Sequence, residues 1–145
     1  MAKEWRHLGA YGLIVQDGKM ALIRKSRGAY TGKLDVPGGT IEHGERPEVT
    51  LVREIKEELD ADVKEFKLFD AESVIVDWNY EGEDLNMHHL GIFYIVTLEN
   101  DVLKSDGDGL DSLGANWYPV NELKEEDVSP LVWIEINKMK KAGII

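Results

Sequence analysis

The sequence contains no cysteine, and it is poor in basic residues. The lack of cysteine excludes disulfide bonds, thiolate zinc sites and cysteine nucleophiles. Only 17 lysines and arginines stand against 28 aspartates and glutamates, which gives a net charge of -11. This acidic balance argues against duplex nucleic acid or an anionic membrane as a partner. A phosphorylated ligand would need cations between itself and the chain.

Long apolar runs are also missing. No window reaches the roughly 18 apolar residues of a membrane span, and the first residues, MAKEWRHLGAYGLIV, lack the basic start and apolar stretch of a signal peptide. No repeat, low-complexity tract or linker interrupts the 145 residues. We therefore expect one globular domain over residues 1–145, located in the cytoplasm and without a membrane partner.

Alternating apolar and β-branched residues predict several strands. A hairpin is expected over residues 8–23, with Asp17-Gly18 as its two-residue turn. Two longer strands are expected at 63–78 and 87–98, joined by a polar loop at 79–86. A short strand is expected at 115–118, after an acidic, glycine-rich loop. Between the hairpin and the first helix, Pro37-Gly38-Gly39 predicts a tight turn or a close backbone approach.

Two substantial helices are expected. The first runs over about residues 46–59, and the last begins with Ser129 as N-cap and Pro130 and stops at Gly143. A brief helix is also expected from Asn121 to Glu125. Mixed strands with two such helices indicate an α/β or α+β sandwich.

Apolar and acidic residues occupy different faces of the first helix. At about 100° per residue, the glutamates 54, 57 and 58 fall in an arc of about 100°. The apolar residues fall in a separate arc of roughly 160°, which is the expected core face: Val49, Leu51, Val52, Ile55 and Leu59.

The glutamate patch is unfavourable by itself. Glu54 and Glu58 form a like-charged i,i+4 pair, and all three acids lie in the half of the helix whose dipole disfavours anions. Only Glu57 has a basic partner one turn back, Arg53. A solvated charged face is the usual interpretation of such a run. Clustered carboxylates without histidine or cysteine alternatively suit Mg²⁺ or Mn²⁺, with calcium less suited because no EF-hand spacing is present. Phosphate chemistry is therefore the leading hypothesis.

The glycine, glutamate and arginine around this patch have a specific spacing. The pattern runs Gly39, five residues, Glu45, seven residues, then Arg53-Glu54-Ile55-Lys56-Glu57-Glu58. It resembles the Nudix box of the MutT/Nudix hydrolases, with which the downstream stretch WYPVNEL also agrees. Two positions depart from the box, because Asp60 replaces a glycine and Ala61 replaces a larger aliphatic residue. Neither departure removes an expected ligand.

The resemblance implies a Nudix α/β/α sandwich with a mixed β-sheet and a loop-helix-loop catalytic motif. It implies that Glu54, Glu57 and Glu58 coordinate Mg²⁺, or Mn²⁺ as an alternative, with help from the Gly39 carbonyl. It further implies that Arg53 and Glu45 orient these ligands. The general base is left open between Glu54, which is our first choice, and an acid from a distant loop: Glu99, Asp106, Asp108 or Asp111.

Substrate contacts are less specific in the sequence. Arg24, Lys25 and Arg27 form a basic cluster that could meet phosphates, although exposed bases commonly only solubilise a protein. Trp78 and Tyr80 are candidates for stacking on a base or, equally, for ordinary packing. The adjacent His88 and His89 alternate faces and lack a chelating spacing, so they are expected to be packed or surface residues.

The favoured hypothesis is a Mg²⁺-dependent pyrophosphohydrolase. Its partner would be a nucleotide-derived small molecule in which a nucleoside diphosphate is linked to another moiety: a nucleoside triphosphate, ADP-ribose, a nucleotide sugar or a dinucleotide. The alternative is a non-catalytic Nudix-fold module that binds a nucleotide and regulates. Whether the chain is a monomer or a homodimer is left open.

Overall fold

The computed structural model describes residues 2–107 and 112–145. Within them the chain forms a seven-stranded mixed sheet, two α-helices and two short 3₁₀ turns. The strands are β1 (Lys3–Gln16), β2 (Lys19–Lys25), β3 (Leu34–Asp35), β4 (Gly38–Thr40), β5 (Val63–Tyr80), β6 (Glu83–Leu98) and β7 (Ser112–Pro119). The helices are α1 (Pro47–Leu59) and α2 (Pro130–Lys141).

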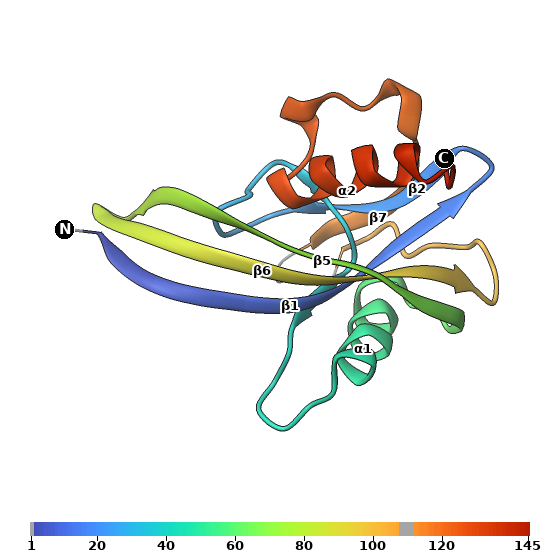
Figure 1. Cartoon of the computed structure of the whole chain (residues 1–145), viewed down its shortest axis with the longest axis horizontal. Helices are drawn as coiled ribbons and strands as arrows, with labels where there is room; N and C mark the ends of the chain where they lie inside the picture. Colours follow the sequence, from blue (N-terminus) through green and yellow to red (C-terminus); the bar gives the residue numbers. More distant parts are fainter. Residues whose placement is uncertain (1, 108–111) are drawn as a thin grey trace.

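The sheet is organised around β1. The strand order is β3-β2-β1-β6-β5, while β4 pairs with β1 and β7 pairs with β2. Strands β1 and β6 are parallel over a long register, and the remaining pairs of named strands are antiparallel. The helices α1 and α2 lie on opposite sides of the sheet (Figure 1). The expected α+β sandwich with a mixed sheet is confirmed.

The core consists of two clusters, one under each helix. Buried residues of α2 pack against the hairpin and β6, and the main contributors are Leu131, Val132, Ile136, Met139, Leu13, Leu22 and Phe93. The cluster under α1 is built mainly from Leu51, Ile55, Leu59, Ala10, Ile14, Ala21 and Val96. Burial on both faces explains why β1 and β2 read as continuous apolar runs. Neither α-helix in the described part of the chain has the length and apolarity needed to cross a membrane.

The buried face of α1 is rotated relative to the face that its sequence predicts. Leu51, Ile55 and Leu59 are fully buried, but Val49 and Val52 are 51% and 42% exposed, so their assignment to the core was wrong. Thr50 and Glu58 are buried instead. The reason is that α1 packs toward β4 as well as β1, so its contact face is turned toward the glutamate side.

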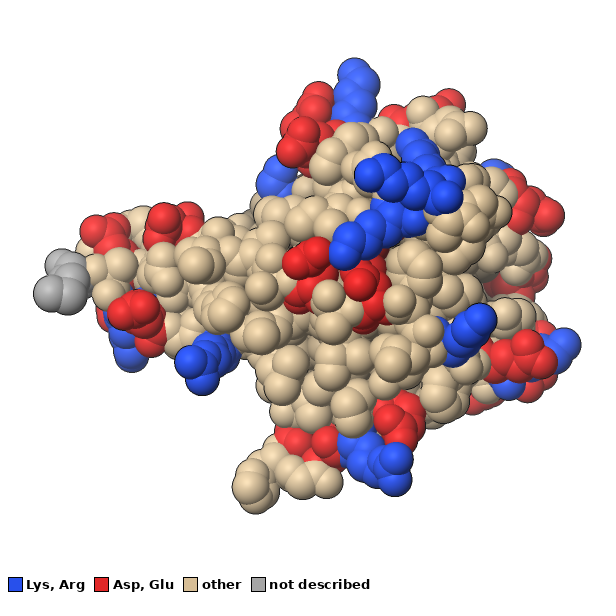
Figure 2. All heavy atoms as spheres, viewed as in Figure 1, with Lys and Arg blue, Asp and Glu red and all other residues tan. Residues whose placement is uncertain are grey.

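The prediction of a polar loop over residues 79–86 is also wrong. Strand β5 extends to Tyr80 and β6 begins at Glu83, so only the turn Glu81-Gly82 separates them. The φ angles of these two residues are 50° and 84°. The polar residues that suggested a loop bond across the two strands, because the Asn79 side-chain amide donates to Asp84 Oδ1 at 2.9 Å. The outer halves of β1, β5 and β6 therefore form an arm that projects from the body (Figures 1 and 2).

The segment before α2 differs in detail from the prediction. In place of one brief helix at 121–125 there are two 3₁₀ turns, Val120–Glu122 and Glu125–Asp127. Ser129 occupies the N-cap position of α2, but its hydroxyl does not cap the helix. It donates to Asp35 Oδ1 at 2.9 Å, which ties the start of α2 to β3.

Glu135 of α2 is a fully buried carboxylate beneath β5. No described residue donates a hydrogen bond to either of its oxygens, whereas its protonated carboxyl group can share a hydrogen bond with Asp70. Nearby, the Lys138 ammonium donates to Asp70 Oδ2 at 2.7 Å and to Glu72 Oε2 at 2.8 Å. Figure 2 shows acidic and basic side chains gathered at the centre of this face. Burial, and then the neighbouring Asp70, raise the pKa of Glu135 to about 8.

Replacement of Glu135 by glutamine should flatten the pH dependence of stability. Because the folded-state pKa is about 8 and the ordinary value is 4.5, the folded protein binds the extra proton between these values. The free energy of unfolding therefore falls as pH rises through this window, by at most about 1.4 kcal/mol per pH unit. The amide carries no charge and can donate to Asp70, so the variant should be the more stable protein at about pH 8.

Thermal unfolding from about pH 5 to pH 8 measures this effect. Glu125→Gln, at an exposed position, is the matched control and should follow the wild-type curve. Parallel curves for wild type and Glu135→Gln would contradict the raised pKa.

Candidate active site

The glycines at 38 and 39 bring β4 against its neighbours. Gly38 has a φ of +146°, and a Cβ there would overlap the Ala10 carbonyl oxygen and lie 2.7 Å from the Tyr11 Cα. A Cβ on Gly39 would lie 2.6 Å from the Glu54 carboxylate. The expected close approach at Pro37-Gly38-Gly39 is therefore confirmed. Only hydrogen at these two positions lets β1, β4 and the carboxylate of Glu54 meet.

Arg53 and Glu45 form a two-pronged ion pair. Arg53 Nε lies 3.0 Å from Glu45 Oε2, and Nη2 lies 2.9 Å from Oε1. The Thr50 hydroxyl also donates to Glu45 Oε1 at 2.6 Å. The hydrogen bonds from Arg53, followed by that from Thr50, lower the pKa of Glu45 to about 2. The paired ends of this contact fix the plane of the guanidinium group.

The other edge of the guanidinium reaches the glutamate patch. Arg53 Nη1 donates to Glu54 Oε1 at 3.0 Å and lies 3.6 Å from Glu57 Oε1. Glu54 is thus held between Arg53 on one side and the backbone of Gly39 on the other. This geometry agrees with the orienting roles expected for Arg53 and Glu45.

Glu58 is not part of an exposed patch with the other two acids. It is only 4% exposed, and its Oε1 accepts the backbone N–H of Gly38 at 2.9 Å. Burial raises the pKa of Glu58 well above its usual value, the hydrogen bond from Gly38 opposes the shift, and nearby Glu54 adds to it. Among residues 2–107 and 112–145, no group of three acidic or histidine side chains is arranged closely enough to hold a metal ion.

The donor set nevertheless suits a hard divalent cation. Glu54 and Glu58 are close enough for the charge of one to raise the pKa of the other, and Glu57 shares Arg53 with Glu54. A bound divalent cation would favour the ionised form of both acids. The missing Cβ of Gly39 also leaves its backbone directly beside the Glu54 carboxylate.

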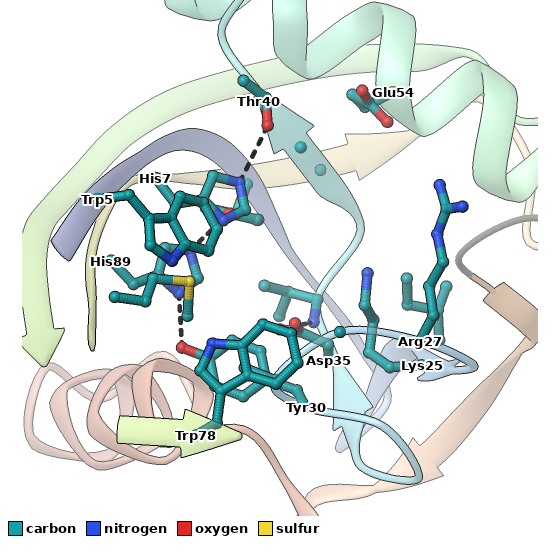
Figure 3. Close-up of a pocket in the computed structure, with 18 of the residues that line it drawn as sticks. Trp5, His7, Lys25, Arg27, Tyr30, Asp35, Thr40, Glu54, Trp78 and His89 are labelled. Atoms are coloured by element: carbon teal, nitrogen blue, oxygen red, sulfur yellow. Dashed lines mark hydrogen bonds between the residues drawn. The ribbon is translucent and has the colours of Figure 1, made fainter. Parts of the chain in front are cut away.

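A pocket of about 440 Å³ opens beside Glu54 and Gly39. Lys25 and Arg27 line it on the same side as Glu54, while aromatic side chains form the remaining walls (Figure 3). These aromatic residues come from β1, β5, β6 and the loop after β2, and they are Trp5, His7, Tyr11, Tyr30, Trp78, Tyr80 and His89. A pocket with a cationic side and aromatic walls suits a ligand that has phosphates at one end and a flat ring at the other.

Three of the aromatic rings are stacked along one wall. The ring centroids of Trp5 and His7 are 5.9 Å apart, and those of His7 and His89 are 4.6 Å apart. The His89 ring nitrogens contact the hydroxyls of Tyr11 and Tyr30, each at 2.7 Å. Burial, followed by the charges on His7 and Lys25, lowers the pKa of His89 to about 3. His89 is therefore neutral at physiological pH, so it donates to one tyrosine and accepts from the other.

Some residues that were expected at the active site do not line this pocket. Arg24 lies on the opposite side of β2 from Lys25, donates to the Gly32 carbonyl at 2.8 Å and lines a different hollow, so its predicted place at the site is wrong. Glu99 and Asp106 do not line the pocket. Asp108 and Asp111, the other two candidate loop acids, lie outside the described residues.

Other pocket residues were not recognised from the sequence as functional. They include Trp5, His7, Asp35 and Met87. A usable signal exists, because Trp5 and His7 are two residues apart on one strand and pair in register with Met87 and His89 on another. Side chains two apart point to the same face of a sheet, but only the parallel pairing of β1 with β6 places these two pairs together.

The two departures from the expected motif are accommodated locally. Asp60 directly follows α1 and adopts a left-handed conformation, with φ 51° and ψ 42°, and its N–H donates to the Lys56 carbonyl at 3.0 Å. Its side chain pairs with Lys56 at 3.4 Å. Ala61 is 2% exposed and packs in the core cluster under α1.

Comparison with known proteins identifies the family. The NUDIX domain family matches residues 5–134. An 8-oxo-dGTP diphosphatase of Escherichia coli is 38% identical over 129 residues, which cover 87% of this chain and 89% of that protein. An ADP-ribose pyrophosphatase of Methanocaldococcus jannaschii is 30% identical over 112 residues, which cover 77% of this chain and 61% of the archaeal protein.

A solved structure supports the same fold. The MutT NUDIX hydrolase from Burkholderia pseudomallei superposes with a TM-score of 0.69 at 23% identity, over 92% of this chain and 97% of that one. The chain therefore belongs to the NUDIX domain family, and its named relatives support a hydrolase that acts on phosphoanhydride bonds.

Proposed function

We propose that the protein is a Mg²⁺-dependent pyrophosphohydrolase, with Mn²⁺ as the alternative ion, that cleaves a diphosphate linkage in a nucleoside diphosphate joined to another group. The observation that carries this proposal is the position of Glu54. Arg53 and the Gly39 backbone hold it at the edge of a pocket that also contains Lys25 and Arg27.

The residues that would hold the metal are Glu54, Glu57, Glu58 and the carbonyl of Gly39. Their support is chemical: the set consists of oxygen donors, and the charge of Glu54 helps to raise the pKa of Glu58. When bound, the ion supplies charge neutralisation of the diphosphate and a lower pKa for the attacking water.

The side chains of the protein would bind the substrate, orient Glu54 and accept a proton. Lys25 and Arg27 would bind phosphate oxygens, which suits their place in the pocket wall. Arg53 would orient Glu54, because it contacts Oε1 at 3.0 Å while its other edge is fixed by Glu45. Glu54 is the candidate to accept the proton of the attacking water. The aromatic walls would bind the nucleoside and exclude water from that end of the pocket.

The substrate is proposed as a class. One relative is named for a nucleoside triphosphate and the other for ADP-ribose, and both compounds contain a nucleoside diphosphate. A panel of nucleoside triphosphates, ADP-ribose, nucleotide sugars and dinucleotide polyphosphates should reveal at least one substrate with Mg²⁺ or Mn²⁺, and EDTA should abolish its turnover. Binding of these nucleotides without turnover would reject the hydrolase proposal and support the non-catalytic nucleotide-binding module.

A further inference from the structure

Asp35 is a buried acidic residue in the wall of the pocket. It comes from the short strand β3 and is only 8% exposed, yet it borders the cavity together with Tyr30 and Trp78 (Figure 3). Burial raises the pKa of its carboxyl group, and the nearby Lys25 ammonium opposes this shift. Acidic side chains are seldom buried to this extent unless they have hydrogen-bonding partners.

The two carboxyl oxygens of Asp35 have different surroundings. Oδ1 accepts the backbone N–H of Val36 at 2.8 Å and the hydroxyl of Ser129 at 2.9 Å. These two donors occupy both lone pairs of Oδ1. In the described part of the chain, no donor is bonded to Oδ2. Since Asp35 lines the cavity, Oδ2 is the acceptor that it offers to a ligand.

A phosphate is a poor partner for this oxygen, because two anions repel each other. The pocket has separate cationic groups for phosphates, Lys25 and Arg27. Around the rest of the cavity the walls are flat rings, with Trp5 and His7 stacked together and Trp78 beside Tyr80, their centroids 5.8 Å apart. Such walls favour a planar heterocycle.

We propose that Asp35 determines which base the pocket accepts, with Oδ2 taking a hydrogen bond from an N–H group on the edge of a planar heterocycle. This inference rests on the proposed function and deepens it. Because Oδ1 is occupied, the carboxyl group cannot form a two-pronged contact across both oxygens. It therefore selects for an amino group or a ring N–H at one position, and against a base that has neither.

Three purine nucleosides test this selection without any metal or turnover. Guanosine has an amino group and a ring N–H, adenosine has an amino group, and purine riboside has no N–H on its base, whereas all three can stack. Wild-type protein should bind guanosine or adenosine about 10- to 100-fold more tightly than purine riboside in titration calorimetry.

Asp35→Asn is the matched substitution. Its amide oxygen can still accept from Val36 and Ser129, but an NH₂ group replaces Oδ2 and turns the acceptor into a donor. We expect the variant to lose the preference for the amino-bearing nucleosides, while its affinity for purine riboside stays within about twofold. The control Ser129→Ala removes a donor to Oδ1 only, so it should lower the melting temperature and keep the preference.

Two results would overturn the inference. One is a wild-type protein that binds all three nucleosides equally, and the other is an Asp35→Asn variant that weakens all three by the same factor, which would mark a purely structural residue. The same comparison of kcat/KM for the three triphosphates separates this inference from the proposed function. Hydrolysis of all three triphosphates at equal rates would contradict the role of Asp35 and leave the proposed function standing. A preference among the bases without any hydrolysis would contradict the proposed function and leave the role of Asp35 standing.

Discussion

Replacement of Glu54 by glutamine should lower kcat for the best nucleotide substrate by about 10²- to 10⁴-fold. Glutamine keeps an oxygen that can accept from Arg53 Nη1, so the ion pair between Arg53 and Glu45 should persist. What is lost is the negative charge that would bind the cation and the basic oxygen that would accept the proton. The fall should therefore appear in activity and not in the melting temperature.

The measurement is kcat and KM over a range of Mg²⁺ concentrations, with thermal unfolding of the same samples. Glu48→Gln is the matched control, because it makes the same charge change in the first turn of the same helix, where Glu48 pairs with Arg46 at 2.9 Å. It should retain wild-type kinetics. A Glu54→Gln enzyme with wild-type kcat at every Mg²⁺ concentration would show that Glu54 is neither the ligand nor the base.

Replacement of Gly38 by alanine should have the largest effect on stability, a loss of about 2–6 kcal/mol in the free energy of unfolding. Two terms contribute. The φ of +146° is unfavourable for an L side chain, and the new Cβ would collide with the Ala10 carbonyl and the Tyr11 backbone. Because β4 would have to move away from β1, the hydrogen bond from Gly38 to Glu58 would also be strained.

Gly44→Ala separates these two terms. Gly44 also has a positive φ, +80°, but no atom lies within 4 Å of the Cβ that alanine would add. This variant should show only the backbone cost, about 1–3 kcal/mol. Denaturant unfolding of both variants, analysed with the slope and midpoint together, measures the difference. Equal losses in the two variants would contradict a close approach of β4 to β1.

The candidate catalytic segment was the most predictable part of the protein. Its contacts are local, since residues 45–58 form one loop and one helix, and the i,i+4 spacing places Arg53 beside Glu57. The clash of like charges on one helix face was visible in the residue spacing. Periodicity misplaced the direction of the core face, because it cannot show that β4 packs beside the helix. That packing buries Glu58, while Val52 remains 42% exposed.

Features that depend on contacts between distant parts of the chain could not be predicted without the tertiary structure. The stretch 79–86 has the composition of a loop, yet its polar side chains bond to each other across β5 and β6, and no local signal distinguishes these two cases. The neighbours Arg24 and Lys25 looked equivalent in the sequence. Only the packing of β2 decides that one lines the pocket and the other faces away.

By itself, the sequence predicted the type of chemistry. It has candidate oxygen ligands and no cysteine, an acidic balance that predicts a cation between the chain and any phosphate, and a motif with the spacing of a family. Each of these depends on residue types or on neighbours along the chain. The tertiary structure alone decided the shape of the pocket. Asp35, Trp5, Trp78 and His89 are far apart in sequence, and the parallel pairing of β1 with β6 and the docking of α2 on β3 bring them around one cavity.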